Sequence, residues 1–277
     1  MKKALIPLAL GALMTMYVRD NKSLTIKRVD IADERIPVSF DGFRILQMTD
    51  VHQAKFGYKQ HRLLKKAKSC APDLIVITGD VIVNSHTPLG EVIDYVKSLQ
   101  AIAPVYFICG NHETLLNKTD LMQFILGLKI CGVTVLRNET IRLYQGKDEI
   151  LLSGIDDPSF KAHKTIEQAQ IIDEEVKGLG ESQMYRILLS HRPECFDVYV
   201  KHQIPLVLCG HTHAGQIRFP FIGALVAPHQ KLFPTYDRGL FEKGATKMYI
   251  SAGLGASDIP LRVLNPPEMT LVTLHHQ

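Results

Sequence analysis

The sequence predicts a layered α/β fold in which strands and helices alternate. Five short apolar runs, each cut off by glycine or a polar residue, have the length and composition of buried strands. These runs occupy residues 45–49, 74–78, 105–109, 187–190 and 206–209. Because the runs show little polar alternation, other layers should cover both faces of their sheet.

The segments between the runs carry helical spacing and helix-start signals. Leu63 and Ala67 mark the apolar face of a first expected helix, which must stop before Pro72. A second helix is expected to begin with Thr87 as its cap and Pro88 in its first turn. The chain thus alternates strand and helix rather than repeating hairpins.

Two more helices and three more strands complete the predicted fold. One helix should open at Thr119 and end near Gly132, and another should begin at Thr165. Gln168 follows Thr165 by three residues, which is the spacing of a capping box. Further strands are expected at residues 149–153, 247–251 and 269–274.

Composition indicates one large domain over residues 23–277. The chain has 277 residues, is 46% hydrophobic and contains no linker-like stretch. Its formal charge of +4 is too small and too dispersed to predict a nucleic-acid partner. The five cysteines are scattered without a CxxC pair, so no disulfide framework is expected and a reducing compartment is favoured. The oligomeric state is left open.

Residues 1–22 form a distinct amino-terminal segment. Two lysines precede the mostly apolar stretch 4–18, which is short for a membrane-spanning helix and lacks a small-x-small cleavage site. We expect an uncleaved membrane anchor; a cleaved signal and a buried helix are the alternatives. Arg19 and Lys22 follow the stretch and favour a catalytic domain on the cytoplasmic side, with an exported or envelope location as the alternative.

Each of the five central runs ends in side chains that bind metal ions. They are Asp50, His52, Asp80, Asn111, His191, His211 and His213. Strand ends gather ligands in α/β sheets, so these side chains should form one cluster. Nitrogen and oxygen donors without thiolate suit Mn, Fe, Zn or Ni better than Ca or Mg. Seven ligands divide naturally between two ions, which could hold a hydroxide between them and clamp a phosphate.

These motifs carry a family resemblance. In this order, Asp-x-His, Gly-Asp, Gly-Asn-His-Glu, a lone His and Gly-His-x-His resemble those of the calcineurin-like metallophosphoesterases. The stretch 210–218, with Gly-Leu-Gly at 253–255 and Pro-Pro-Glu at 266–268, resembles the membrane-associated bacterial branch. That branch includes the YkuE and YaeI phosphodiesterases and UDP-2,3-diacylglucosamine hydrolases. The resemblance covers about residues 40–274. It implies a four-layer αββα sandwich, with two mixed sheets face to face and helices outside.

The resemblance also implies a role for each motif residue. One ion would be held by Asp50, His52, Asp80 and His213. The second would be held by Asp80, Asn111, His191 and His211, so that Asp80 bridges the two. His112 would bind no metal and would protonate the leaving oxygen. Manganese is the expected metal, with Fe, Zn or Ni as alternatives.

One departure from the family motifs limits which phosphoesterases the chain resembles. The protein-phosphatase branch has Asp-Arg-Gly beginning three residues after the bridging aspartate, whereas this chain has Val83-Asn84-Ser85. A protein Ser/Thr phosphatase is therefore disfavoured, and what positions His112 is open. Asp157 is either a turn residue or a substrate contact, and Arg218 either reaches a phosphate or solvates the surface.

The sequence therefore predicts a dinuclear metal-dependent hydrolase. Its expected substrate is a phosphodiester or pyrophosphate borne by a membrane or the envelope, such as a UDP-diacylglucosamine-type lipid precursor. The alternatives are a broad phosphomonoesterase with the same site and a non-catalytic scaffold on the same fold. Cys109 and Cys209 adjoin motif glycines, but as small residues ending apolar strands they are expected in the core rather than on the metal.

Overall fold

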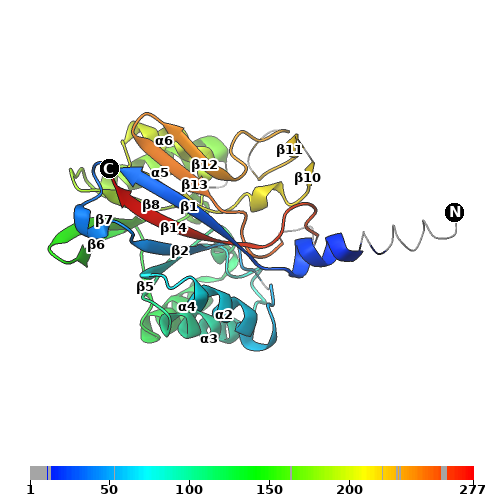
Figure 1. The fold of residues 1–277 in the computed structure, drawn as a ribbon. Helices are drawn as coiled ribbons and strands as arrows, with labels where there is room; N and C mark the ends of the chain where they lie inside the picture. Colours follow the sequence, from blue (N-terminus) through cyan, green and yellow to red (C-terminus); the bar gives the residue numbers. More distant parts are fainter. Residues whose placement is uncertain are drawn as a thin grey trace.

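Two six-stranded mixed sheets form the centre of the protein (Figure 1). The computed structural model describes residues 11, 14–52, 54–162, 164–219, 221–228, 230, 232–256 and 261–277. The predicted anchor at residues 1–22 therefore lies mostly outside the described residues, although residues 14–22 are helical. In the part of the chain that is described, no helix has both the length and the apolar character needed to cross a bilayer.

The first sheet has the order β1-β14-β2-β3-β4-β5. Its strands are β1 (Thr25–Asp33), β14 (Glu268–His276), β2 (Arg44–Met48), β3 (Leu74–Thr78), β4 (Val105–Ile108) and β5 (Thr134–Val135). β2 to β5 run parallel, β14 is antiparallel to β2, and β1 is parallel to β14. Three of the predicted apolar runs are β2, β3 and β4.

The second sheet has the order β12-β13-β9-β8-β7-β6. Its strands are β12 (Gly239–Lys243), β13 (Thr246–Ile250), β9 (Leu206–Cys209), β8 (Arg186–Leu189), β7 (Asp148–Gly154) and β6 (Glu139–Gln145). β13, β9, β8 and β7 run parallel, and the two edge strands pair antiparallel. The other two predicted runs are β8 and β9, side by side at the centre.

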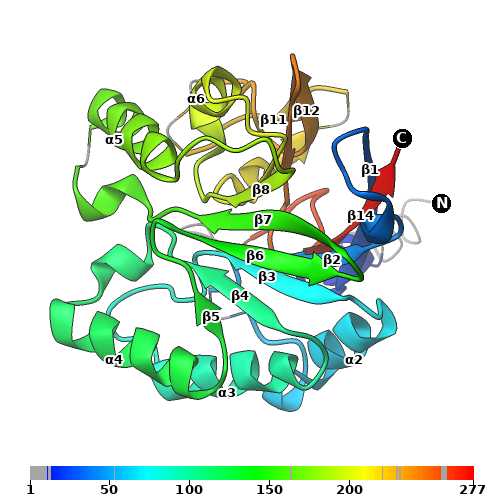
Figure 2. The same ribbon diagram turned by 90° about the vertical axis from the view of Figure 1, so that its left-hand side faces the viewer.

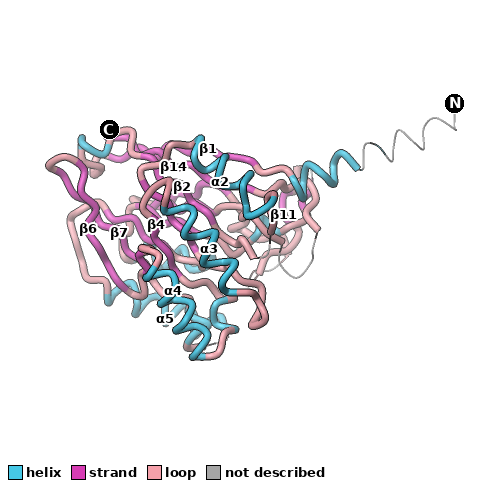
Figure 3. The backbone as a smooth tube through the Cα atoms, turned by 90° about the horizontal axis from the view of Figure 1, so that it is seen from below, coloured by secondary structure: helices cyan, strands magenta, loops and turns pink. Residues whose placement is uncertain are grey.

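Helices cover the outer face of each sheet (Figure 2). The helices α2 (His61–Ser69), α3 (Leu89–Gln100) and α4 (Lys118–Ile130) pack on the first sheet, and Figure 3 shows them from below in front of the strands. The helices α5 (Thr165–Gly178) and α6 (Phe196–Lys201) pack on the second. The inner faces meet through Ile45, Val76, Leu152 and Leu208. These four layers confirm the predicted αββα sandwich.

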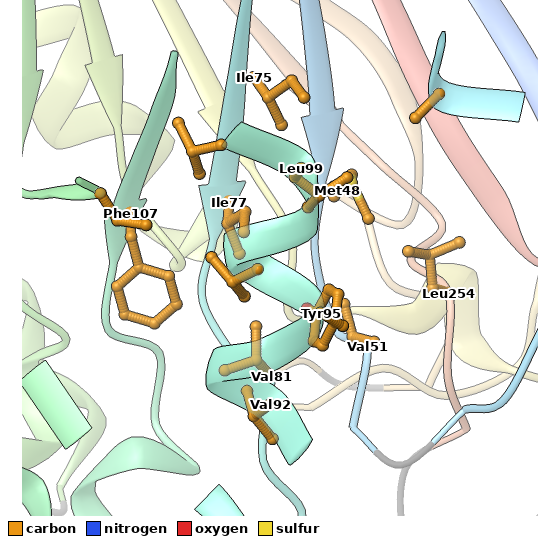
Figure 4. Packing of buried hydrophobic residues seen from close by; sticks show 14 of the residues in the cluster. Met48, Val51, Ile75, Ile77, Val81, Val92, Tyr95, Leu99, Phe107 and Leu254 are labelled. Atoms are coloured by element: carbon orange, nitrogen blue, oxygen red, sulfur yellow. The ribbon is translucent and has the colours of Figure 1, made fainter. Parts of the chain in front are cut away.

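The packing of α3 shows how the sheets are held in place (Figure 4). Val96 and Leu99 are fully buried, and they belong to one cluster with Ile75, Ile77 and Met48 of the adjacent strands. Each fully buried aliphatic side chain stabilises the fold by roughly 1.5–3 kcal/mol. This packing fixes the positions of β2 and β3, and therefore of the loops that leave their carboxyl ends.

Three predicted helix caps are wrong, although α5 begins at Thr165 as predicted. Thr87 does not cap α3; its Oγ1 instead accepts hydrogen bonds from the backbone N–H groups of Val83 and Asn84. The cap of α4 is Asn117, whose side chain accepts from Asp120 N, rather than Thr119. Gln168 does not complete a capping box, because its Oε1 has no partner among the described residues and its Nε2 donates elsewhere.

Candidate metal centre

Four of the five central strands deliver six of the predicted ligands to one place. Asp50 and His52 follow β2, Asp80 follows β3, and Asn111 follows β4. His191 follows β8, and His211 and His213 follow β9. The ligand atoms of Asp50, His52 and His213 lie within 4.8 Å of one another, as do those of Asp80, His191 and His211. Both sheets therefore contribute to one cluster at their facing edges.

The backbone at these strand ends is held in a rare conformation. Five of the seven residues, Asp50, His52, Asp80, His211 and His213, have φ between 48° and 74°. Non-glycine residues avoid this left-handed region, and strain of this kind gathers at functional sites. The neighbouring loops also approach closely, since a Cβ on Gly79 would lie 2.6 Å from Gly110 N. The turns therefore aim side chains inward at the expense of local stability.

Two imidazoles of the first group face each other without a proton between them. His52 Nδ1 lies 2.8 Å from Ile82 O, and His213 Nδ1 lies 3.2 Å from Gly255 O. Each Nδ1–H therefore donates to a carbonyl, which leaves each Nε2 as a lone pair. The two Nε2 atoms are 3.2 Å apart, and Asp50 Oδ1 is 3.5 Å from His213 Nε2. Three electron-pair donors converge here, as a cation site requires.

Two further buried atoms at the strand ends lack hydrogen-bond partners. His191 Nδ1 lies 2.7 Å from Thr78 O, so its Nε2 is directed at Asp80 Oδ2, 3.1 Å away, without hydrogen-bond geometry. Asn111 Oδ1 is buried and has no hydrogen-bond partner among the described residues. Unsatisfied buried acceptors are rare in folded proteins and call for an explanation. A divalent ion satisfies both atoms, so the residues present fit such a group.

The electrostatics of the cluster favour added positive charge. Burial raises the pKa of Asp50 and lowers the pKa values of His52 and His213. Burial would also lower the pKa of His191, but the charge of Asp80 raises it to about 10. Burial would raise the pKa of Asp80, yet the facing histidine holds it well below its usual range. Positive charge beside the two buried carboxylates stabilises their ionised forms, and a bound cation can supply that charge.

His112 lies at the edge of the cluster, and the structure shows what orients it. Its Nδ1 lies 2.6 Å from Val83 O, so Nδ1–H donates to this carbonyl and Nε2 points toward the site, 3.9 Å from Asp80 Oδ2. The side chain is 18% exposed, whereas that of His191 is fully buried. Thr87 Oγ1 in turn accepts from Val83 N at 3.1 Å. A backbone carbonyl thus positions His112 in a chain that lacks the Asp-Arg-Gly motif.

Glu113 ties two of the ligand loops together. Its carboxylate is fully buried and accepts from the backbone N–H groups of Asp80, Val81 and Gly110 at 2.9, 2.9 and 2.6 Å. Burial raises its pKa to about 7. The sequence motif included this glutamate, but its spacing gave no role for it. The structure assigns it to the support of the loops after β3 and β4.

Asp157 and Arg192 form a buried ion pair behind the second group. Arg192 Nε and Nη2 donate to the two carboxylate oxygens of Asp157 at 2.6 and 2.8 Å, and both side chains are almost fully buried. Arg192 Nη1 also lies 3.0 Å from His211 Nε2. Sequence reasoning missed Arg192, although it directly follows His191. The substrate contact predicted for Asp157 stays a prediction, and this position favours support of His211 instead.

Arg218 and the two motif cysteines also have defined places. Arg218 Nη1 donates to Asp237 Oδ2 at 2.7 Å and to Ala214 O at 2.9 Å. The guanidinium is therefore tied to its own loop, and its predicted phosphate contact stays a prediction. Cys109 and Cys209 are fully buried in the apolar clusters on the outer faces of the two sheets, which confirms that they belong to the core.

A buried arginine supports His213 from behind. Arg262 Nε donates to Gly255 O at 3.0 Å, the same carbonyl that accepts from His213 Nδ1, and Nη2 donates to Ala252 O at 2.8 Å. Burial lowers the pKa of Arg262 to about 10. Its backbone N–H donates to Asn21 Oδ1 at 2.8 Å. The amino-terminal helix therefore contacts Arg262, which supports the site.

Comparisons with known proteins agree with this geometry. The calcineurin-like phosphoesterase model matches residues 43–215. The chain is 31% identical over 255 residues to the uncharacterized metallophosphoesterase YkuE of Bacillus subtilis, covering 88% of this chain and 83% of that protein. It is 32% identical to an uncharacterized metallophosphoesterase of Helicobacter pylori, covering 83% of this chain and 59% of that protein.

A solved structure supports the fold alone. The structure of TT1561 from Thermus thermophilus aligns with a TM-score of 0.51 at 12% identity, covering 76% of this chain and 90% of that one. The family match spans more than half of the chain and includes most of the clustered residues. The chain belongs to the calcineurin-like phosphoesterase family and is a metallophosphoesterase with a dinuclear divalent metal site.

Proposed function

We propose that this metallophosphoesterase hydrolyses a phosphodiester or pyrophosphate bond on a substrate carried by a membrane or the cell envelope. The observation that carries the hydrolytic part is the meeting of six of the predicted donor side chains from four strand ends, with the lone pairs of His52 and His213 facing one another. A UDP-diacylglucosamine-type lipid precursor is one substrate of this class. The catalytic domain comprises residues 23–277 and works beside the predicted anchor, on the cytoplasmic side.

We assign the seven side chains to two ions. One set is Asp50, His52, Asp80 and His213, and the other is Asp80, Asn111, His191 and His211. The position of Asp80 supports its sharing between the two ions. A carboxylate oxygen of Asp80 lies within 4.8 Å of ring nitrogens of His52 and His112, and the same holds for ring nitrogens of His191 and His211. Two bound ions would activate water and stabilise charge on the phosphate. The mixed nitrogen and oxygen donors favour manganese, with Fe, Zn or Ni as alternatives.

His112 supplies the proton to the leaving oxygen. Its Nδ1–H is held by Val83 O, so Nε2 is the atom that can carry the transferable proton. Because its side chain keeps 18% exposure at the rim of the cluster, a substrate can reach it. General acids of this kind contribute about 10² to 10⁴ in rate.

The charges around the site favour a diester over a monoester. A monoester dianion calls for more positive charge than a diester monoanion does. In the described part of the chain, however, Arg192, Arg218 and Arg262 are already engaged by other groups. Arg192 is buried against Asp157, Arg218 is bonded to Asp237, and Arg262 donates to the carbonyls of Gly255 and Ala252.

The proposal is tested with matched aryl phosphates. The full-length protein loaded with Mn²⁺ should show a higher kcat/KM on bis(4-nitrophenyl) phosphate than on 4-nitrophenyl phosphate. The reverse order would make the protein a phosphomonoesterase with the same site. Less than one transition metal per chain, together with no effect of a chelator, would identify a scaffold rather than an enzyme.

A further inference from the structure

An exposed apolar hairpin follows the last metal-site histidine. The strands β10 (Arg218–Phe219) and β11 (Gly223–Ala224) pair antiparallel. We call the described residues between 218 and 233 the apolar hairpin, and its exposed large apolar side chains are Phe219, Phe221, Ile222, Leu225, Val226, Leu232 and Phe233. Phe221 is 109% exposed, so it makes almost no contact with the rest of the protein. Contiguous patches of this kind on a folded protein mark interaction surfaces.

The apolar hairpin lies beside the amino-terminal helix. Arg218 N donates to Val263 O at 3.1 Å, and the neighbouring Leu264 N donates to Asp20 Oδ2 at 2.6 Å. The loop at residues 262–264 therefore joins the base of the hairpin to the end of the helix. In Figures 1 and 3 the helix and β11 lie on the same side of the molecule.

The amino-terminal helix also exposes apolar side chains. Its exposed large apolar side chains are Met14, Tyr17 and Val18, which are 63%, 44% and 44% exposed, and Arg19 and Lys22 are exposed at its carboxyl end. These residues end the mostly apolar stretch 4–18, most of which lies outside the described residues. Two apolar segments far apart in sequence thus come together on one side of the protein.

The charged residues of the hairpin and its base are mostly basic. The sequence from 216 to 238 contains Arg218, Lys231 and Arg238 against a single acidic residue, Asp237, which pairs with Arg218 at 2.7 Å. A cleft of about 550 Å³ at the base of the hairpin is lined by Arg218, Arg238, Asp237, Phe219 and Phe221, among others, so its lining carries a net positive charge. Exposed aromatic and aliphatic side chains next to basic ones are typical of segments that bind anionic lipid surfaces. The apolar side chains enter the membrane interface, while the basic groups stay at the lipid headgroups.

We propose that the apolar hairpin docks on an anionic lipid bilayer beside the amino-terminal segment, with Phe221 and Ile222 inserted into the interface. Because the hairpin begins five residues after His213, this docking brings the metal centre to the membrane surface. The proposal concerns binding alone and does not rest on the reaction that the site performs. A second copy of the chain is the competing occupant.

The absence of tryptophan from the sequence gives a direct test. Phe221→Trp places a single emitter at the hairpin tip, and Ile166→Trp is the matched control on α5, where Ile166 is 78% exposed. Both full-length variants are reconstituted into vesicles of phosphatidylcholine and phosphatidylglycerol, with and without brominated acyl chains. Brominated chains should quench the Phe221→Trp emission about twofold or more and leave the control unchanged. Replacing phosphatidylglycerol with phosphatidylcholine should weaken this quenching.

Three outcomes would overturn the proposal. Emission from Phe221→Trp that brominated lipid leaves unquenched would show that the tip stays in water. Emission that shifts to the blue with protein concentration in lipid-free detergent would show that a second copy covers the hairpin. Quenching that is the same with and without phosphatidylglycerol would show that the hairpin does not recognise anionic headgroups. Unchanged thermal melting of both variants would show that the substitutions leave the fold intact.

Discussion

Replacing Thr87 with valine should slow hydrolysis without removing metal, because it releases the loop that orients His112. Thr87 is 5% exposed, and its Oγ1 accepts from Val83 N and Asn84 N at 3.1 and 3.2 Å. The carbonyl of Val83 then accepts from His112 Nδ1 at 2.6 Å. Valine keeps the shape of threonine but lacks the acceptor, so both hydrogen bonds to the loop are lost.

The size of the effect follows from these two bonds. A neutral hydrogen bond contributes about 0.5–1.5 kcal/mol net, so the pair holds the loop by about 1–3 kcal/mol. If the variant loses all of this free energy and must recover it to align His112 in the transition state, kcat should fall about 5- to 150-fold, because 1.36 kcal/mol corresponds to a factor of ten in rate. The free energy of unfolding should decrease by no more than the same amount.

The assay compares two diesters that differ in their leaving groups. Hydrolysis of an alkyl aryl diester that expels a poor leaving group should slow far more than hydrolysis of bis(4-nitrophenyl) phosphate, since only the former needs the acid. Metal content per chain should stay at the wild-type value. Thr140→Val is the control, because it removes a bond to Ser153 Oγ at the edge of the second sheet. Wild-type rates on the poor leaving group would refute the positioning of His112 by this loop.

Three further substitutions test the other parts of the site. Asp80→Asn should lower both activity and metal content the most, and near-normal metal content and rate would refute its bridging role. His112→Ala should keep both metals yet lower kcat by about 10² to 10⁴, most for poor leaving groups; an equal effect on all leaving groups would count against an acid. Asp157→Asn should destabilise the fold by up to about 3–5 kcal/mol, seen as a lower Tm, because buried Arg192 loses its bidentate carboxylate partner and keeps only Glu194 at 3.4 Å. A raised KM with an unchanged Tm would instead show that Asp157 contacts substrate.

The central strands could be predicted from sequence because strands that are buried on both faces consist almost entirely of apolar residues. Both faces of β3 and β9 are covered, so Leu74–Thr78 and Leu206–Cys209 are almost entirely apolar. The edge strand β1 was missed for the opposite reason: Thr25–Asp33 mixes charged and apolar residues. β1 pairs with β14 from the other end of the chain, Thr25 opposite Glu268, and no local pattern encodes such a partner.

The supports of the site were hidden for a similar reason. Val83 acts on His112 through a backbone carbonyl, which every residue possesses, so no side-chain pattern can reveal it. Arg192 and Asp157 are 35 residues apart and meet only after β7 and β8 are paired. Thr87 does form side-chain hydrogen bonds, as a capping residue would, but its hydroxyl accepts from the loop that precedes it rather than from α3.

The sequence by itself determined which side chains stand at the strand ends, and so the layered fold, the metal chemistry and the family. Strand burial and ligand type are local properties, and residue order records them directly. Only the tertiary structure decided which donor atoms face one another and that Val83 holds His112. It alone placed the apolar hairpin and the amino-terminal helix on one side of the protein. These are distances between segments far apart in the chain, and they exist only once the two sheets have packed together.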